Sequence, residues 1–316
     1  MIDRKLISIV IPVLNEEKNI PLIYKGVVSV FRELKEKYDY KIIFVNDGSE
    51  DKGGEIINEL SKSSEKVKYI EFSRNFGKEI ATSAGINHCS GDAVIIIDAD
   101  LQHPPEMIPD FIRKWEEGAD IVIGTRKENK RNGIVRRIGA YFFYRIINSI
   151  GETKVSPNAT DFRLLDKKII NEFNRFTERN RITRGLVDWM GFKRDYVQFN
   201  VGSRNCGKAR YGCLRLVKLA ISTFVSHSLF PLKFAGYLGI IITFFSGILG
   251  LFIFIEKYIL MDPWGLSVSG SAILAVIILF LIGVVLICLG LMALYIANIQ
   301  GEVMNRPMYI IRSKKL

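Results

Sequence analysis

Residues 94–106 read VIIIDADLQHPPE, an apolar run followed by Asp98, Asp100 and Gln102 on alternate positions. The apolar run predicts a buried strand whose carboxyl end carries these polar side chains. If the extended conformation persists, the pleat of the strand places all three on one side. Three oxygen-bearing side chains facing one point suit Mg²⁺ or Mn²⁺ shared with a diphosphate, since Mg²⁺ usually keeps only one or two protein carboxylates. The alternative is that Asp98 and Asp100 only cap a helix or start a turn.

The chain before and after this stretch alternates short apolar runs with helical patterns. The apolar runs cover residues 6–11, 41–46, 67–72, 93–98 and 120–125, and the helical patterns cover 18–36, 51–62, 77–88 and 105–117. This alternation predicts an α/β domain with a mostly parallel sheet covered on both faces. Such sheets bind ligands beyond the carboxyl ends of their strands, here residues 12–16, 46–49, 73–78, 98–102 and 125–126.

The last third of the chain is far more apolar. Residues 234–255 and 265–300 contain no charged residue, and a bilayer-spanning helix needs roughly 20 apolar residues. We therefore expect two transmembrane helices, at about 234–255 and 272–297; the alternative is two buried helices of a globular core. The flanking cations place both termini on the cytoplasmic side; these are Lys218, Lys233, Arg306, Arg312, Lys314 and Lys315.

These features predict three regions. Residues 1–212 form a cytosolic catalytic domain, 213–232 an interfacial helix or linker, and 233–316 a membrane domain with a short cytosolic C-terminal tail. Residues 134–150 and 213–230 combine arginines with many aromatic residues, which is typical of interfacial amphipathic helices, although ordinary core helices remain an alternative. The protein is expected to be integral to the cell inner membrane.

The net charge of +11 is compatible with nucleic acid, anionic lipid or a phosphorylated substrate. The basic residues crowd 126–145 and 175–218, and the sequence has neither zinc-ligand spacing nor a nucleic-acid module. The membrane surface and a phosphate-bearing lipid are therefore the favoured partners, without nucleic acid. The four cysteines show no metal-type spacing and are interpreted as reduced; they are Cys89, Cys206, Cys213 and Cys288.

Several further motifs accompany the acidic stretch. They are IPVLNEE (11–17), VNDGS (45–49), SRNFGKE (73–79), GTR (124–126), ATDFRLLDKK (159–168), ERNRITRGLVDWMGF (178–192) and RNCGKARY (204–211). With DADLQHPPE and the two apolar segments, this set resembles the family-2 glycosyltransferases with the A-type nucleotide-sugar fold. Within that family, it is most similar to the dolichyl-phosphate mannosyltransferase and bacterial polyprenyl-phosphate glycosyltransferase branch. The resemblance covers nearly the whole chain.

The resemblance implies roles for individual residues. Asp98, Asp100 and Gln102 would form the metal and diphosphate site, and Asp161 would be the catalytic carboxylate near the acceptor, with Asp100 and Arg204 also catalytic. The implied nucleoside contacts are Pro12, Glu16 and Asp47, with Arg74 and Lys78 as further substrate-binding residues. The implied contacts to the acceptor phosphate are Arg126 and Arg136 or Arg137, and Arg179, Arg181 and Arg184 extend this basic platform.

The reaction implied is an inverting transfer of a sugar from a nucleotide sugar to a polyprenyl phosphate such as undecaprenyl phosphate. UDP-glucose is the favoured donor; UDP-N-acetylglucosamine, an aminoarabinose donor and GDP-mannose stay open, because Asn46, Ala209 and Arg210 depart from the usual pattern. A homo-oligomer also stays open.

Other functions are less well supported. A polysaccharide synthase would carry Q-x-x-R-W and more membrane spans, which the sequence lacks, whereas a membrane-anchored nucleotide-sugar sensor would share the fold without turnover. An NTPase is disfavoured because residues 202–209 match a phosphate loop except that Ala209 lacks the Mg²⁺-binding hydroxyl.

Overall fold

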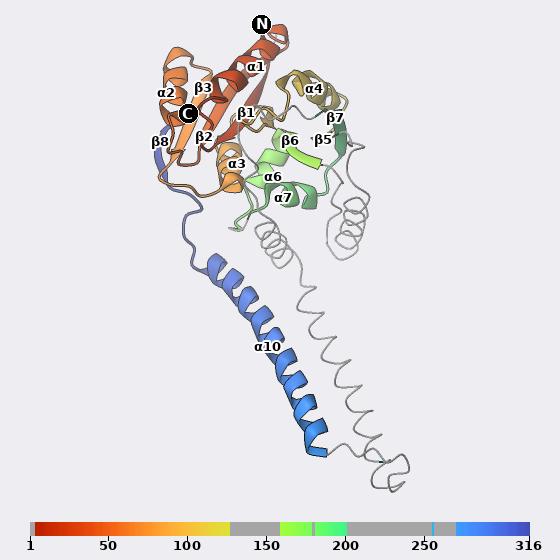
Figure 1. Cartoon of the computed structure of the whole chain (residues 1–316). Coiled ribbons are helices and arrows are strands. Elements are labelled where there is room, and N and C mark those ends of the chain that lie inside the picture. Colours follow the sequence, from red (N-terminus) through yellow and green to blue (C-terminus); the bar gives the residue numbers. More distant parts are fainter. Residues whose placement is uncertain (1–3, 127–158, 179–180, 201–254, 256–269) are drawn as a thin grey trace. The chain divides into compact units, whose positions relative to one another are not determined.

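The structure of the chain is a computed structural model that describes residues 4–126, 159–178, 181–200, 255 and 270–316 (Figure 1). The chain divides into two compact units, one of Met1–Ala209 with Asn305–Leu316 and the other of Arg210–Met304. The last twelve residues, predicted as the cytosolic tail of the membrane domain, belong by their contacts to the larger unit.

The larger unit is built on one eight-stranded sheet. Its strands are β1 (Lys5–Val13), β2 (Tyr38–Asn46), β3 (Val67–Phe72), β4 (Ala93–Ile96), β5 (Ile121–Arg126), β6 (Ala159–Asp166), β7 (Arg194–Phe199) and β8 (Ile311–Lys315). The order across the sheet is β7-β5-β6-β4-β1-β2-β3-β8. Strands β6 and β8 run antiparallel to their neighbours, and the remaining pairs are parallel. The predicted mostly parallel α/β sheet is therefore confirmed.

Helices cover both faces of this sheet (Figure 1). Residues of α1 (Ile20–Glu33), α2 (Gly53–Ser63) and α4 (Ile108–Glu116), which follows the short 3₁₀ turn η1 (Pro105–Met107), pack into one apolar cluster. Residues of α3 (Lys78–Asn87), α6 (Lys167–Phe173) and α7 (Thr183–Trp189) pack into the other. The strand pleat separates the two clusters: Ile9 and Ile11 belong to the first, whereas Val10 between them belongs to the second.

The position of α3 against the sheet depends on the absence of a side chain at Gly85. A Cβ atom there would lie 2.2 Å from Cγ1 of Val10, which is fully buried. This close approach sets the depth at which α3 lies on β1, and it brings the start of α3 close to the carboxyl ends of the central strands.

Gly85→Ala is expected to lower the free energy of unfolding by about 1–3 kcal/mol, because the added methyl group overpacks the core against Val10. Thermal unfolding of the purified chain measures this change. The control is Val10→Ala, alone and in combination with Gly85→Ala. Since the two residues touch, the double variant should be more stable than the sum of the single losses predicts; strict additivity would contradict the proposed clash.

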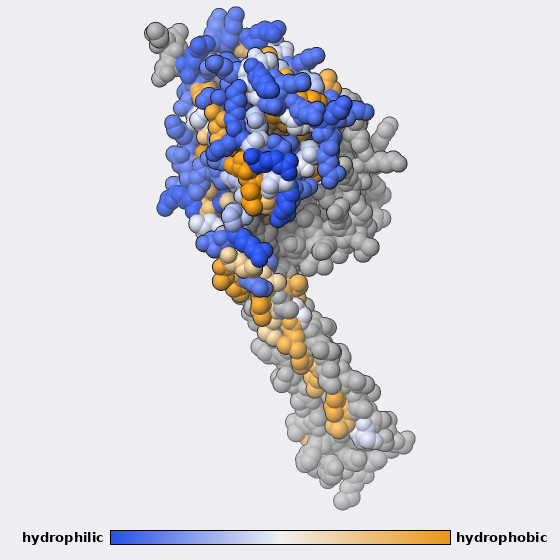
Figure 2. All heavy atoms as spheres, turned by 90° about the vertical axis from the view of Figure 1, so that its left-hand side faces the viewer, coloured by the Kyte–Doolittle hydropathy of each residue, from blue (hydrophilic) through white to orange (hydrophobic). Residues whose placement is uncertain are grey.

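Helix α10 (Gly270–Val303) is the only long helix among the described residues, with 34 residues. Many of its described apolar side chains are exposed, including Leu274, Val285 and Ile296 at 60%, 56% and 63%, and the part that faces the viewer in Figure 2 is hydrophobic. In the part of the chain that the structure describes, no helix is long and apolar enough to cross a membrane. The other predicted span, at 234–255, lies outside the described residues except for Ile255.

Candidate active site

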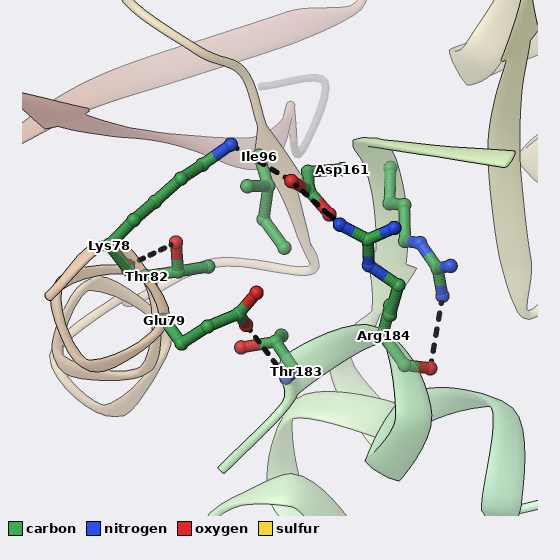
Figure 3. A pocket seen from close by; sticks show the side chains of 8 residues that line it. Lys78, Glu79, Thr82, Ile96, Asp161, Thr183 and Arg184 are labelled. Carbon is green, nitrogen blue, oxygen red and sulfur yellow. Dashed lines mark hydrogen bonds and ion pairs between the residues drawn. The ribbon is translucent and has the colours of Figure 1, made fainter. Parts of the chain in front are cut away.

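Three charged side chains, Lys78, Asp98 and Asp161, meet beside the carboxyl ends of the central strands. Figure 3 shows Lys78 and Asp161 of this group. Nζ of Lys78, the first residue of α3, lies 2.7 and 2.8 Å from the two carboxylate oxygens of Asp98 and 2.8 Å from Oδ2 of Asp161. Asp98 follows β4, and Asp161 lies on β6, the antiparallel neighbour of β4. Lys78 therefore joins two carboxylates that are 63 residues apart in the chain.

A second cation completes the network from α7. Nη2 of Arg184 lies 3.1 Å from Oδ1 of Asp161. Burial alone would raise the pKa of Asp161, but Lys78 and Arg184 outweigh it and hold this pKa well below its usual range. For Lys78, burial acts to lower the pKa, and the two carboxylates overcome this and raise it well above the usual value. Both groups are therefore charged at every pH near neutrality.

A small cavity lies under this network. Its volume is about 10 Å³, which is room for one water molecule. Its lining residues are Lys78, Glu79, Thr82, Ile96, Asp161, Arg163, Thr183 and Arg184. Oε2 of Glu79 accepts a hydrogen bond of 2.9 Å from the backbone N–H of Thr183, so the start of α7 is fixed to the first turn of α3.

Arg163 is a buried residue of β6, the strand that carries Asp161. Its side chain is 2% exposed and forms an ion pair of 3.1 Å with Asp188 on α7. Its guanidinium also donates to the backbone oxygens of Thr160 and Arg184, at 3.2 and 3.5 Å. Because Arg163 contacts both β6 and α7, it fixes the spacing between Asp161 and Arg184.

The acidic stretch itself does not stay extended. Strand β4 ends at Ile96, and Leu101 adopts a positive φ of 62°, so the expected single-sided alternation of Asp98, Asp100 and Gln102 is not realised. The turn instead folds Gln102 back onto Asp100. The backbone N–H of Gln102 donates to Oδ1 of Asp100 at 3.1 Å, and its Nε2 donates to Oδ2 at 2.9 Å.

The oxygen atoms of this turn are of the type that binds a divalent cation. Within the described part of the chain, no three His, Cys, Asp or Glu side chains are grouped closely enough to hold a metal ion together. Asp100 and the amide oxygen of Gln102 are nevertheless hard oxygen donors on one turn, and Mg²⁺ needs only one or two carboxylates when a substrate diphosphate supplies the other ligands. Asp98, the third predicted ligand, is bound to Lys78 instead.

The sequence of this chain matches known proteins along nearly its whole length. Residues 8–173 match the family model described as glycosyl transferase family 2. The SfII prophage-derived bactoprenol glucosyl transferase of Shigella flexneri is 41% identical over 97% of this chain and 97% of its own length. The prophage bactoprenol glucosyl transferase homolog of Escherichia coli (strain K12) is 39% identical over 98% of this chain and 99% of its own.

The chain belongs to glycosyl transferase family 2. Among solved structures, glucosyl-3-phosphoglycerate synthase from Mycobacterium tuberculosis, in complex with Mn²⁺, UDP and glucosyl-3-phosphoglycerate, aligns with a TM-score of 0.46 and 17% identity. That alignment covers 70% of this chain and 79% of the other.

In this glycosyltransferase, the predicted nucleoside contacts lie at the ends of β1 and β2. Asp47 is 2% exposed, and its carboxylate accepts hydrogen bonds from the backbone N–H groups of Phe76 and Gly77, at 2.7 and 3.0 Å. Burial raises the pKa of Asp47. Its carboxylate therefore anchors the loop after β3. Glu16 accepts a hydrogen bond of 2.5 Å from Nδ2 of Asn19, and Pro12 is buried within β1.

The other predicted contacts are placed as follows. Arg126, at the end of β5, lies 3.4 Å from Oε1 of Gln102, so it belongs to the acidic turn. The guanidinium of Arg74 stacks 4.2 Å above the ring of Phe76. Arg136, Arg137 and Arg204 lie outside the described residues, as do both predicted interfacial helices. Their assigned roles stay predictions.

His103 lies at the site but is not among the residues predicted from the sequence. It is 1% exposed, and its Nδ1 accepts a hydrogen bond of 3.3 Å from the backbone N–H of Asp98. Burial lowers the pKa of His103, so the ring is neutral near pH 7 and stacks on Phe162 at 5.3 Å. A lone histidine before two prolines carries no signal of this role, because its hydrogen bond depends on the turn of the tertiary structure.

Proposed function

We propose that this glycosyltransferase transfers glucose from UDP-glucose to a polyprenyl phosphate and releases UDP. The observation that carries the proposal is the extent of the match, because the relatives named bactoprenol glucosyl transferases align over 97–99% of both chains. The similarity therefore includes the apolar C-terminal segments as well as the nucleotide-sugar domain. Bactoprenol is a polyprenol, so the acceptor class follows from these names.

The reaction is a single displacement at the anomeric carbon. An oxygen of the acceptor phosphate forms the new bond, the bond from carbon to the diphosphate oxygen breaks, and its electron pair leaves with UDP. The configuration of the sugar is inverted. A divalent ion held by Asp100 and Gln102 would stabilise the negative charge that develops on the leaving diphosphate.

Asp161 acts in this proposal by holding cations in place. A carboxylate with a strongly lowered pKa is a poor base, and Asp161 is already paired with Lys78 and Arg184. The acceptor needs no base, since a phosphate monoester has a second pKa of about 6 and is largely dianionic at neutral pH. Asp161 therefore keeps the two cations where an incoming phosphate can meet them.

Membrane anchoring is part of the proposal. Residues 234–255 and 265–300 carry no charge, and a bilayer-spanning helix needs roughly 20 apolar residues. Strand β8 follows α10 and lies in the same sheet as β3. Because both ends of the chain belong to one compact unit, an even number of spans fits this arrangement. We propose two spans, with both termini cytoplasmic, in the cell inner membrane.

The test is a lipid-labelling assay. Membranes containing the chain are incubated with undecaprenyl phosphate and one labelled donor at a time: UDP-glucose, UDP-N-acetylglucosamine, an aminoarabinose nucleotide or GDP-mannose. Labelled lipid is expected from UDP-glucose. A different productive donor would correct the sugar, whereas no labelled lipid from any donor would favour a nucleotide-sugar sensor.

A further inference from the structure

The C-terminal tail, residues 305–316, adds strand β8 to the sheet edge formed by β3. Strand β8 runs antiparallel to β3, with Glu71 opposite Ser313 and Phe72 opposite Ile311, and the register shifts between Glu71 and Phe72. The ring of Tyr309 stacks on that of Phe72, with centroids 5.0 Å apart. The tail therefore follows β3 to its last residue.

Contacts of the tail extend past the end of β3. The backbone N–H of Ser73 donates a hydrogen bond of 2.9 Å to the backbone oxygen of Ile310. Nη2 of Arg312 donates one of 3.0 Å to the backbone oxygen of Ser73. Both backbone polar groups of Ser73 are thus bound by the tail, although Ser73 belongs to the loop that leads into α3.

The far end of the same loop is fixed by β2 and the residues after it. Asp47 binds the backbone N–H groups of Phe76 and Gly77. Gly48, with a φ of 70°, lies so close that a Cβ atom there would be 2.5 Å from the backbone carbon of Arg74. Lys78, which bridges Asp98 and Asp161, follows this loop directly.

We propose that residues 309–312 of the tail are a positioning element that fixes the loop 73–77. Through this loop, the tail would also position Asp47, the predicted nucleoside contact that binds Phe76 and Gly77. The loop is bound at Ser73 by the tail and at Phe76 and Gly77 by Asp47, so release of one end leaves it attached only at the other. The part of this inference that concerns the donor rests on the proposed function. In the chain, residues 309–312 follow α10 after the intervening residues 304–308.

Strand β8 also covers the edge of the sheet, and this role is simpler than positioning the loop. A strand added at a sheet edge covers unpaired backbone groups and stabilises the fold wherever it lies. Arg312 distinguishes the two roles, because its side chain is 62% exposed and therefore contributes little to packing, yet it binds Ser73. Lys314 is an exposed residue of the same strand, opposite Ile70, and serves as the matched control.

The first measurement is amide hydrogen exchange of the full chain in detergent. Arg312→Ala is expected to speed exchange at Ser73, Phe76 and Gly77 by about threefold to tenfold, the effect of losing one hydrogen bond, with no change in β1. Lys314→Ala should leave the loop unchanged. Glu71→Gln, which removes the ion pair of 3.6 Å between Glu71 and Arg312 but leaves the contact with Ser73, should also leave it unchanged. Unchanged exchange in Arg312→Ala, or an equal effect of Glu71→Gln, overturns the inference.

The second measurement is steady-state kinetics. Arg312→Ala should raise the KM for UDP-glucose by about threefold to tenfold, while kcat at saturating donor stays within a factor of about two of the parent chain. An equal fall in kcat with an unchanged KM would overturn the link to the donor. If the parent chain turns over no donor, the proposed function fails, and the exchange experiment still decides whether the tail positions the loop.

Discussion

Asp100→Asn is expected to reduce turnover by about 10²–10³-fold, the usual effect of removing one preorganised group that stabilises developing charge. Asparagine keeps the size of the side chain and an oxygen that can accept from the backbone N–H of Gln102. It lacks the negative charge that a divalent cation requires. The loss should therefore appear in catalysis and in cation binding while the fold is retained.

The measurements are initial rates with UDP-glucose and Mn²⁺ binding followed by electron paramagnetic resonance. Excess EDTA should abolish the turnover of the parent chain, and Mg²⁺ or Mn²⁺ should restore it. Asp110→Ala is the matched control, because Asp110 lies on α4 and forms a surface ion pair with Arg113. If Asp100→Asn bound Mn²⁺ like the parent chain, or kept full turnover, the assignment of the acidic turn as the metal site would be wrong.

Asp161→Asn is expected to lower kcat by about 10²-fold or more at saturating acceptor, because two cations lose the carboxylate that orients them. Without Asp161, Lys78 keeps its ion pair with Asp98, and Arg184 loses the ion pair of 3.1 Å with Asp161. If Asp161 acts by positioning, Lys78→Met should cause a similar loss, and the double variant should lose little more than either single variant, since the two residues act as one unit.

The pH dependence of kcat separates positioning from base catalysis by Asp161. The pKa of Asp161 is lowered in the folded chain. Ionised Asp161 therefore stabilises the fold at any pH above its pKa in the unfolded chain, which is about 3.9. This stabilisation is lost only as the pH falls through the lower pKa of the folded chain. We expect no loss of kcat assignable to this carboxyl group between about pH 5 and 8. An acidic limb in that range that disappears in Asp161→Asn would show that Asp161 acts as a base.

Much of the fold could be predicted from the sequence. The runs within β1 and β4 are buried and almost entirely apolar on both faces of the pleat, which only a sheet covered on both sides can bury. The sequence pattern does not predict β6, β7 and β8 as strands, because these segments carry charged residues such as Arg163, Arg194 and Arg312. Arg163 is buried only because Asp188, distant in sequence, neutralises it.

The sequence predicts which types of residue lie at the site, but it does not predict which of these side chains bind one another. Acidic residues at the ends of strands indicated a phosphate and metal chemistry, and Asp98, Asp100, Gln102 and Asp161 do lie at that edge of the sheet. Which of them bind one another depends on a turn at Leu101 with a positive φ, a conformation that the sequence pattern gives no reason to expect at leucine.

The sequence by itself determined what can be read from neighbouring residues: the alternation of strands and helices, the two uncharged segments and the family motifs. The tertiary structure alone decided that Lys78 bridges Asp98 and Asp161, that His103 supports the acidic turn, and that the tail returns to bind Ser73. The physical reason is the range of the interactions. Periodicity and turn chemistry act over a few residues. A strand pairing joins residues as far apart in the sequence as Tyr69 and Lys315, and it forms only when the chain has folded.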